Sequence, residues 1–261
     1  MTAAVWILVS ARMASSRRPG KALADLAGRP LLEVLLERMR TVGGVAGVAL
    51  ATSVRPENDV LAAVAERLGV PVFRGDEDDV LRRHLEGARW LGADHVVRVT
   101  GDNPLTDVET AEALVAQHLA AGADYTYVPG DALLMGILSE VISTDAMARA
   151  WDRGDARHRS ELMTLYMKEH PAEFRIALGT LPADLYRPRY RLTVDEPEDI
   201  ALMQALFARL AQPGRVVTTR EAIALMDADP ALADINAAAR HKAANLHSVA
   251  LDSTIVGSNP R

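Results

Sequence analysis

The first half of the chain alternates short apolar runs with longer amphipathic segments. The short runs are rich in β-branched residues, which predicts strands at 5–10, 45–53, 70–75 and 94–101. Between them, apolar residues recur at i, i+3, i+4 and i+7, which predicts helices at 30–42, 58–69 and 77–92, and a fourth helix follows at 107–122. Near-continuous apolar strands that alternate with helices are typical of a parallel sheet covered on both faces.

Residues that favour helix ends support these boundaries. Pro30 suits the first turn of a helix, and Asn58 suits an N-cap position. Gly69 and Gly92 stand where the C-caps of two helices are expected. The predicted helices therefore begin and end near the limits of their apolar pattern.

The alternation changes after about residue 123. Four further segments resemble strands, at 123–130, 136–144, 174–181 and 190–194. Four more segments have a helical pattern, near 144–153, 157–169, 196–211 and 218–229. We expect the new strands to form an antiparallel extension of the same sheet, with part of this region projecting as a lobe.

These patterns predict one domain followed by a tail. The domain spans residues 1–237 and includes a mid-chain extension over about 125–190. The tail, 238–261, has little periodicity, so we expect it to fray or to pack loosely.

Composition narrows the possible functions. The 261 residues include 29 Lys and Arg against 35 Asp and Glu, and a net charge of −6 argues against broad nucleic-acid binding. The absence of cysteine excludes disulfides, thiolate metal sites and cysteine nucleophiles. No apolar run approaches the roughly 20 residues that span a bilayer, and the opening is a poor signal peptide. We therefore expect a cytoplasmic enzyme or binding protein.

A basic loop follows the first predicted strand. Its sequence, SARMASSRRPGK, carries Arg12, Arg17, Arg18 and Lys21 before any acidic residue. Ligands of parallel α/β sheets bind beyond the carboxyl ends of the strands, where a polyphosphate can meet backbone N–H groups and several cations together. We therefore predict a polyphosphate site here. The alternative is a solvated loop whose arginines pair with acidic neighbours such as Asp25.

The loop matches neither of two common nucleotide-binding motifs. A Walker A motif would need glycine where Ser15 stands and Ser or Thr where Ala22 stands. No Gly-x-Gly-x-x-Gly fingerprint of dinucleotide-binding proteins is present either. Ser15 and Ser16 have no recognisable His and Asp partners, so the sequence does not indicate a serine nucleophile.

Two aspartates follow β-rich runs in a similar way. Asp102 stands after VRVTG, and Asp195 stands after YRLTV and before a predicted helix. Two carboxylates that face a triphosphate from strand ends suit Mg²⁺, because this ion takes oxygen ligands and shares the phosphates. Two alternatives remain open: Asp195 caps the following helix, with Pro197 in its first turn, and Asp102 stabilises a turn.

Six motifs occur in a characteristic order along the chain. They are SARMASSRRPGK, KALADLAGRPLLEVLLERM, VPVFRGDEDDVLRRH, VRVTGDNPLTD, RLTVDEPED and AIALMDADPALADIN. Together they span roughly residues 4–237 and resemble the cytidylyltransferase family of the spore coat polysaccharide type, which is related to the acylneuraminate and Kdo cytidylyltransferases. Each motif alone is moderately specific, whereas their shared order is a strong signal.

The resemblance implies a fold and a reaction. The implied fold is GT-A-like, an α/β nucleotidyltransferase fold whose mostly parallel central sheet is flanked by helices. The implied reaction transfers CMP from CTP to an anionic acceptor (a sugar acid, a sugar phosphate or a phosphonate) with Mg²⁺ as cofactor, and it releases pyrophosphate. Relatives are commonly homodimers in which the mid-chain lobe forms the contact.

The resemblance also implies roles for individual residues. Arg12 and Lys21 would act in catalysis by stabilising charge that develops on the phosphates. The implied nucleotide-binding residues are Ala11, Arg12, Arg17, Lys21, Arg74 and Asp79, and the implied metal ligands are Asp102 and Asp195.

The acceptor side departs from the family pattern. Leu138 stands where the family has aspartate, while Glu140 is retained, and Leu162 stands where the family has histidine. With Tyr125, these residues form the predicted acceptor pocket, which is more apolar than usual or has relocated its polar contacts. Core packing is the alternative for Tyr125. The sequence therefore does not identify the acceptor, the pathway or the oligomeric state.

Two other functions remain open at this point. One is another nucleotidyltransferase, or a metal-dependent glycosyltransferase, of the same architecture. The lack of an Asp-x-Asp motif at the central strand edge argues against the glycosyltransferase. The other is a nucleotide-binding protein without catalytic activity.

Overall fold

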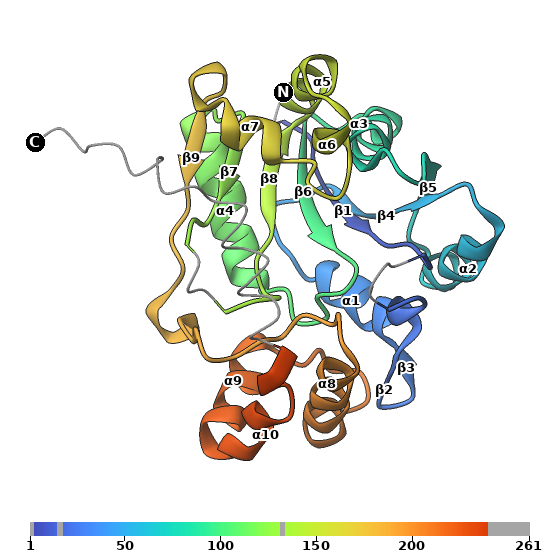
Figure 1. Ribbon diagram of the computed structural model, residues 1–261, viewed down its shortest axis with the longest axis vertical. Helices are drawn as coiled ribbons and strands as arrows, with labels where there is room; N and C mark the ends of the chain where they lie inside the picture. The colour runs from blue at the N-terminus through green and yellow to red at the C-terminus, as the bar shows by residue number, and fades with distance from the viewer. Residues whose placement is uncertain (1–2, 15–17, 131–133, 240–261) are drawn as a thin grey trace, which may run out of the picture.

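A seven-stranded sheet forms the centre of the computed structural model, which describes residues 3–14, 18–130 and 134–239 (Figure 1). The strand order is β5-β4-β1-β6-β8-β7-β9. In chain order, the strands are β1 (Val5–Ser10), β4 (Gly47–Ser53), β5 (Val72–Gly75), β6 (His95–Thr100), β7 (Tyr125–Tyr127), β8 (Glu140–Ser143) and β9 (Ile176–Leu178). A small hairpin, β2 (Asp25–Leu26) with β3 (Arg29–Pro30), lies apart from this sheet.

The direction of the strands divides the sheet into two parts. β5, β4, β1 and β6 run parallel to one another. β8 is antiparallel to both β6 and β7, and β9 pairs in parallel with β7. The predicted fold class is therefore confirmed: a mostly parallel α/β sheet with an antiparallel extension.

Helices cover both faces of the sheet. They are α1 (Leu31–Met39), α2 (Asp59–Arg67), α3 (Val80–Leu91), α4 (Val108–Ala121), α5 (Thr144–Arg153), α6 (Ala156–Arg159), α7 (Leu165–Glu169), α8 (Pro197–Leu210), α9 (Thr219–Ala228) and α10 (Pro230–Asp234). Side chains alternate along β1, so Ile7 and Val9 join a buried cluster with α1, α2 and α4, while Leu8 joins a second cluster with α3, α5 and α7.

A third buried cluster holds α8, α9 and α10 against the rest of the domain (Figure 1). Leu105, which follows β6, packs in this cluster with Leu192 and Val194, which precede α8. The same packing therefore anchors the two chain segments that carry Asp102 and Asp195.

The predicted strand at 190–194 is wrong. This segment forms one isolated bridge, from Arg191 to Met135, and no regular strand among the described residues. The predicted helix at 157–169 is also wrong, because it is divided into α6 and α7. The Ser160 hydroxyl donates to the Arg157 carbonyl at 2.6 Å, and such a local bond competes with helix continuation.

The helix-end predictions had mixed outcomes. Gly92 is the C-cap of α3 with a left-handed φ of 64°, as predicted, and Gly69 follows α2 with a φ of 67°. Pro30 precedes α1 instead of lying in its first turn. Asn58 occupies the N-cap position of α2, but its side chain makes no capping bond, because it binds other groups described below. The β2–β3 hairpin was not predicted.

The mid-chain helices pack against the body of the domain. α5 and α6 contact α3. Met147, Met163 and Met167 are buried in the second cluster, to which α3 also contributes. These helices therefore cover one face of the sheet, and whether part of this region acts as a dimer lobe stays a prediction. The domain limits 1–237 and a homodimer contact through residues 125–190 stay predictions, and the tail from residue 240 onward lies outside the described residues.

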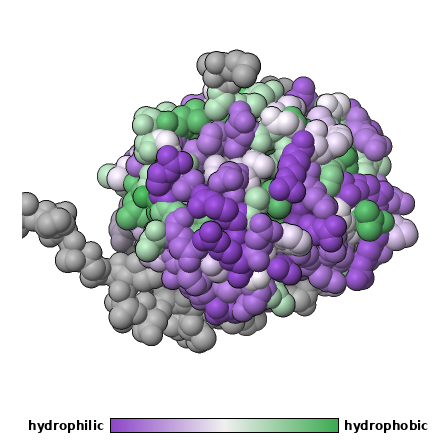
Figure 2. All heavy atoms as spheres, turned by 90° about the horizontal axis from the view of Figure 1, so that it is seen from above, coloured by the Kyte–Doolittle hydropathy of each residue, from purple (hydrophilic) through white to green (hydrophobic). Residues whose placement is uncertain are grey.

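The surface is predominantly polar where Figure 2 shows it. Hydrophilic side chains cover most of this face, and apolar ones are scattered among them. Within the described ranges, no helix has the length and apolar character that crossing a bilayer requires.

Gly136 lets two chain segments approach each other closely. Its φ is 93°, and a Cβ atom there would lie 2.2 Å from the backbone nitrogen of Thr193. Next to it, the Leu192 N–H donates to the Met135 carbonyl at 2.7 Å. This contact fixes the course of the segment that leads to Asp195.

Replacing Gly136 with alanine should lower the free energy of unfolding by about 3 kcal/mol or more, because left-handed strain adds to a clash with backbone. Gly44→Ala is the matched control. Gly44 has a φ of 74° but no atom within 4 Å of an added Cβ, so its substitution should cost about 1 kcal/mol. Denaturant unfolding measures both values, and equal losses would contradict the close approach.

Candidate functional site

Lys21 joins the two aspartates that the sequence singled out. It lies in the short 3₁₀ helix Lys21–Leu23 at the end of the basic loop, after Gly20, whose φ is 75°. Its Nζ donates to Asp102 Oδ2 at 2.6 Å and to Asp195 Oδ1 at 2.8 Å. Burial opposes the charge on Lys21, but the two carboxylates outweigh it and raise the pKa of the ammonium. The group therefore combines one cation with two anions.

Close backbone packing brings these side chains together. A Cβ atom on Gly101 would lie 2.6 Å from the Cβ of Ala11. The segments that leave β1 and β6 can therefore run this close together only with glycine at position 101. The Gly101 N–H donates to the Ser10 carbonyl at 2.8 Å. The Asp102 carbonyl accepts the Val194 N–H at 2.9 Å, which ties the β6 turn to the segment before Asp195.

The capping alternative for Asp195 is wrong. The N-cap of α8 is Glu196, which forms a capping box with Asp199. Asp195 instead gives one oxygen to Lys21 and the other to Arg191, whose Nη2 lies 2.9 Å away. Asp102 does lie in a turn, but its carboxylate also reaches Lys21.

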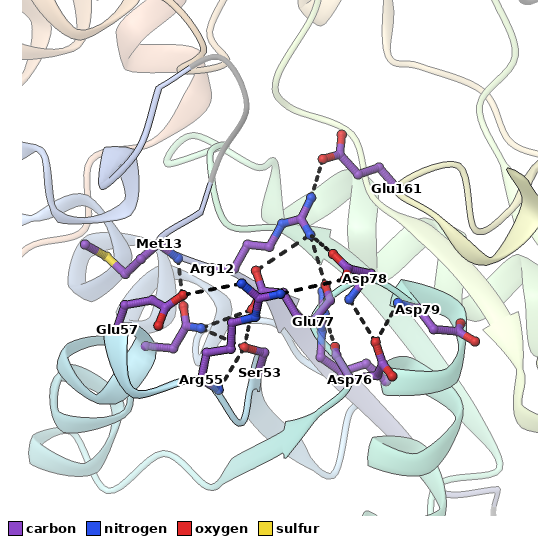
Figure 3. A network of polar contacts seen from close by, with 12 residues as sticks. Arg12, Met13, Ser53, Arg55, Glu57, Asp76, Glu77, Asp78, Asp79 and Glu161 are labelled. Atoms are coloured by element: carbon purple, nitrogen blue, oxygen red, sulfur yellow. Dashed lines mark hydrogen bonds and ion pairs between the residues drawn. The ribbon is translucent and has the colours of Figure 1, made fainter. Parts of the chain in front are cut away.

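Arg12 lies beside a second acidic group (Figure 3). Its guanidinium donates to the Glu77 carbonyl at 2.9 Å and to Glu161 Oε1 at 2.5 Å, and Asp78 lies 3.9 Å away. The alternative of an arginine paired with acids therefore describes Arg12 in this structure. Asp25, the acid suggested by the sequence, accepts the N–H of Gly28 instead. Arg17 lies outside the described residues.

A buried polar cluster under the loop was not predicted. The Asn58 amide donates to Ser53 Oγ at 2.7 Å and to Glu77 Oε2 at 3.2 Å, and its carbonyl accepts the Met13 N–H at 2.7 Å. These bonds fix the basic loop to the end of β4 and the start of α2, and Figure 3 labels Met13, Ser53 and Glu77 in this cluster. Arg83 donates to the same Glu77 carbonyl as Arg12, at 3.1 Å. Only the apparent N-cap at Asn58 marked this cluster in the sequence.

Arg74 and Asp79 lie in local structural contacts. Arg74 donates to the Ser53 carbonyl at 3.0 Å and pairs with Asp59 at 2.6 Å. Asp79 is the N-cap of α3 and also accepts the indole N–H of Trp151 at 2.8 Å. Their contact with a nucleotide stays a prediction.

Of the four residues predicted to line the acceptor pocket, Tyr125 and Glu140 are in direct contact, whereas Leu138 and Leu162 lie in other surroundings. The ring of Tyr125 is fully buried and stacks on Tyr127, and its hydroxyl donates to Glu140, so the ring packs in the core, and a contact with an acceptor stays a prediction. Leu138 packs against the third buried cluster, near α8 and α9. Leu162 is half exposed, next to the segment that carries Glu161.

Glu140 is the centre of a charged group that the sequence did not reveal. It pairs with Arg98 of β6 at 2.7 Å and with Lys168 of α7 at 3.1 Å. Burial would raise the pKa of Glu140, but Lys168, Arg98 and the hydrogen bond from Tyr125 lower it to about 2. The carboxylate is therefore ionised and held between two cations.

Asp102 and Asp195 present the carboxylate oxygens that Mg²⁺ takes as ligands. In the part of the chain that the structure describes, no three His, Cys, Asp or Glu side chains are grouped to hold a metal. Two carboxylates that share one cation nevertheless suit Mg²⁺, which commonly takes one or two carboxylates, with phosphates and water completing its shell. The residues present therefore fit this ion.

Comparisons with known proteins assign this chain to a family. A match to the family described as Cytidylyltransferase covers residues 6–223. An uncharacterised protein of Methanocaldococcus jannaschii is 33% identical over 235 residues, which cover 90% of this chain and 95% of the relative. The spore coat polysaccharide biosynthesis protein SpsF of Bacillus subtilis is 32% identical over 233 residues, 87% of this chain and 95% of the relative.

A solved structure agrees with the fold. The cytidylyltransferase of Leptospira borgpetersenii superposes with a TM-score of 0.81 at 24% identity, and the match covers 88% of this chain and 97% of that one. At this identity the structural likeness supports the fold alone. The family match and the two relatives establish the family, because they rest on sequence similarity over most of the chain. This chain belongs to the cytidylyltransferase family and is a nucleotidyltransferase enzyme.

Proposed function

We propose that this enzyme transfers CMP from CTP to a small anionic acceptor, such as a sugar acid, a sugar phosphate or a phosphonate, and releases pyrophosphate. The observation that carries the proposal is the placement of Lys21 between Asp102 and Asp195 at the end of the basic loop. Similarity to SpsF supports an acceptor that is a precursor of a polysaccharide.

The nucleotide side supplies charges that fit a triphosphate. Asp102 and Asp195 would hold Mg²⁺, which, when bound, neutralises negative charge on the phosphates. Lys21 and Arg12 would then contact phosphate oxygens in place of the carboxylates that they contact now. Lys21 is mostly buried, so its charge acts at low local dielectric and interacts strongly with an incoming anion.

The reaction needs little other chemistry from the protein. A lone pair on an acceptor oxygen forms the new bond to the α-phosphorus of CTP. The bond from that phosphorus to the bridging oxygen breaks, and its electron pair leaves on pyrophosphate. An acceptor oxygen that is already ionised has no proton to lose, so positioning and charge neutralisation suffice.

The acceptor side supplies cations for the anionic group of the acceptor. Arg98 and Lys168 flank Glu140, and Arg98 lies on β6, the strand that ends next to Asp102. Arg98 also donates to the Glu161 carbonyl at 3.4 Å, which links this group to the residue that pairs with Arg12. We propose that the acceptor binds between these cations and the Lys21 group.

Calorimetry and a pyrophosphate assay test the proposed function together. We expect Mg²⁺-dependent binding of CTP in preference to ATP, GTP and UTP, and pyrophosphate release with at least one sugar acid, sugar phosphate or phosphonate. Asp102→Asn should lower turnover at least about 100-fold without unfolding the protein, because one carboxylate of the proposed metal site is lost. Selective CTP binding without turnover on the whole panel would favour a non-catalytic binding protein.

Lys21→Ala should weaken the binding of CTP about 10- to 100-fold and that of CMP much less. The lost group is a charge-assisted donor to phosphate, and CMP lacks the outer two phosphates. Lys21→Arg, which keeps the positive charge, is the control and should retain more affinity. An equal loss for both nucleotides, measured by calorimetry, would place the ammonium away from the triphosphate.

Glu161→Gln should strengthen the binding of CTP about two- to fivefold. Glu161 is 60% exposed and competes with phosphate for Arg12, and an exposed ion pair contributes about 0.2–1 kcal/mol. Glu169→Gln is the matched control, since this acid of α7 pairs with Arg157 instead. The same shift in both variants would attribute the effect to net charge and not to the Arg12 pair.

A further inference from the structure

A buried polar group lies behind Asp195. It consists of Arg191, Asp199 and Asn236, which are 1%, 0% and 1% exposed. Arg191 precedes α8, Asp199 lies in its first turn, and Asn236 follows α10. Among the described residues, Lys21 bonds to Asp102 and Asp195 and to none of these three side chains. Any effect of the three on the site therefore acts through Asp195.

Arg191 holds one carboxylate oxygen of Asp195 from the inside. Its Nη2 donates to Asp195 Oδ2 at 2.9 Å and to Asp199 Oδ2 at 3.0 Å, and its Nε donates to Asp199 Oδ1 at 2.9 Å. The planar guanidinium thus grips two carboxylates at once, a geometry that lysine cannot reproduce. Because Asp195 Oδ2 faces Arg191, Oδ1 is the oxygen that faces Lys21.

Asp199 holds the backbone of the same residue. Its Oδ2 accepts the N–H groups of Asp195 and Glu196, both at 3.0 Å. The main chain and the side chain of Asp195 are therefore fixed by one buried ion pair. A carboxylate held at both levels loses little freedom when a cation binds to its other oxygen.

Asn236 connects this pair to the C-terminal helices. Its Nδ2 donates to the Arg191 carbonyl at 3.0 Å and to Asp199 Oδ1 at 2.8 Å. Asn236 thus donates to acceptors on both members of the pair. It follows α10, which packs in the third buried cluster through Leu232.

Stability alone gives little reason to keep this arrangement. Removing a guanidinium and a carboxylate from water is costly, and replacing a buried ion pair with apolar residues is often neutral or stabilising. The buried pair does, however, set the direction of a carboxylate at the edge of the proposed nucleotide site.

We propose that Arg191 is a positioning residue for cytidylyl transfer, which turns Oδ1 of Asp195 toward the metal and nucleotide, with Asp199 and Asn236 holding Arg191 in place. The inference rests on the proposed function, because it assumes that Asp195 binds the divalent ion. It also gives the C-terminal helices a role, because Asn236 connects them to the Arg191–Asp199 pair.

The test measures how CTP binding to the full-length protein depends on Mg²⁺, by calorimetry. Arg191→Lys keeps the charge but loses the two-carboxylate grip, and it should raise the Mg²⁺ concentration for half-maximal CTP binding about 10- to 100-fold. Asn236→Ala leaves the ion pair intact and should give a smaller shift in the same direction. Binding of CMP without Mg²⁺ should change less than twofold in both variants.

Thr219→Val is the control for a purely structural loss. Thr219 is also buried, and its hydroxyl donates to the carbonyl of Leu105, a residue of the third buried cluster, at 3.0 Å. Among the described residues, the Thr219 hydroxyl makes no bond to Arg191 or Asp199. This variant should lose stability, measured by denaturant unfolding, without a change in Mg²⁺ dependence. If Arg191→Lys does not fold, Asn236→Ala against Thr219→Val decides the question.

The outcomes separate this inference from the proposed function. A wild-type protein whose CTP binding is independent of Mg²⁺ would overturn both the metal site and the positioning role. Mg²⁺-dependent wild type with unchanged dependence in the folded Arg191 and Asn236 variants would overturn only the positioning role. An equal shift in Thr219→Val would also overturn it, because the effect would then follow stability.

Discussion

The ion group of Lys21, Asp102 and Asp195 is the interaction on which the rest of the site depends. Its three side chains are 12%, 19% and 7% exposed, so water screens them weakly and their charges must compensate one another. Such a group can form only where three distant chain segments meet without intervening side chains. Gly101 and Gly136 supply this closeness, because a Cβ at either position would collide with a neighbouring segment.

The acids around the proposed nucleotide site differ in how readily a ligand could replace them. Glu161 contacts Arg12 from an exposed position, and such an exposed ion pair costs little to break. Asp199 is completely buried and bonded to Arg191, so breaking its contacts would be costly. Exposure therefore separates carboxylates that are easily displaced from carboxylates that are held firmly. Asp195 combines both situations, because Arg191 holds one of its oxygens and the other faces Lys21.

The sequence predicted the architecture well because the signals for it are local. Apolar periodicity identified the strands and helices of the parallel half, and the rule that ligands bind at the carboxyl ends of parallel strands indicated where the basic loop and Asp102 would lie. The weaker predictions fall where long-range packing competes with local pattern. Segment 190–194 has a strand-like composition, but its neighbours offer it a single bridge at Met135. Tyr125 and Leu138 were assigned to one predicted pocket, yet they pack in different buried clusters.

By itself, the sequence determined the fold class, the order of the family motifs and the presence of cationic and acidic side chains at strand ends. Only the tertiary structure decided which of these side chains meet. Lys21 and Asp195 are 174 positions apart, and no local pattern records that their atoms lie 2.8 Å from each other. The tertiary structure also decided that Glu196, not Asp195, caps α8, and that Arg191 turns inward to hold Asp195. Charge pairing depends on distance and burial, and both arise only when the chain has packed.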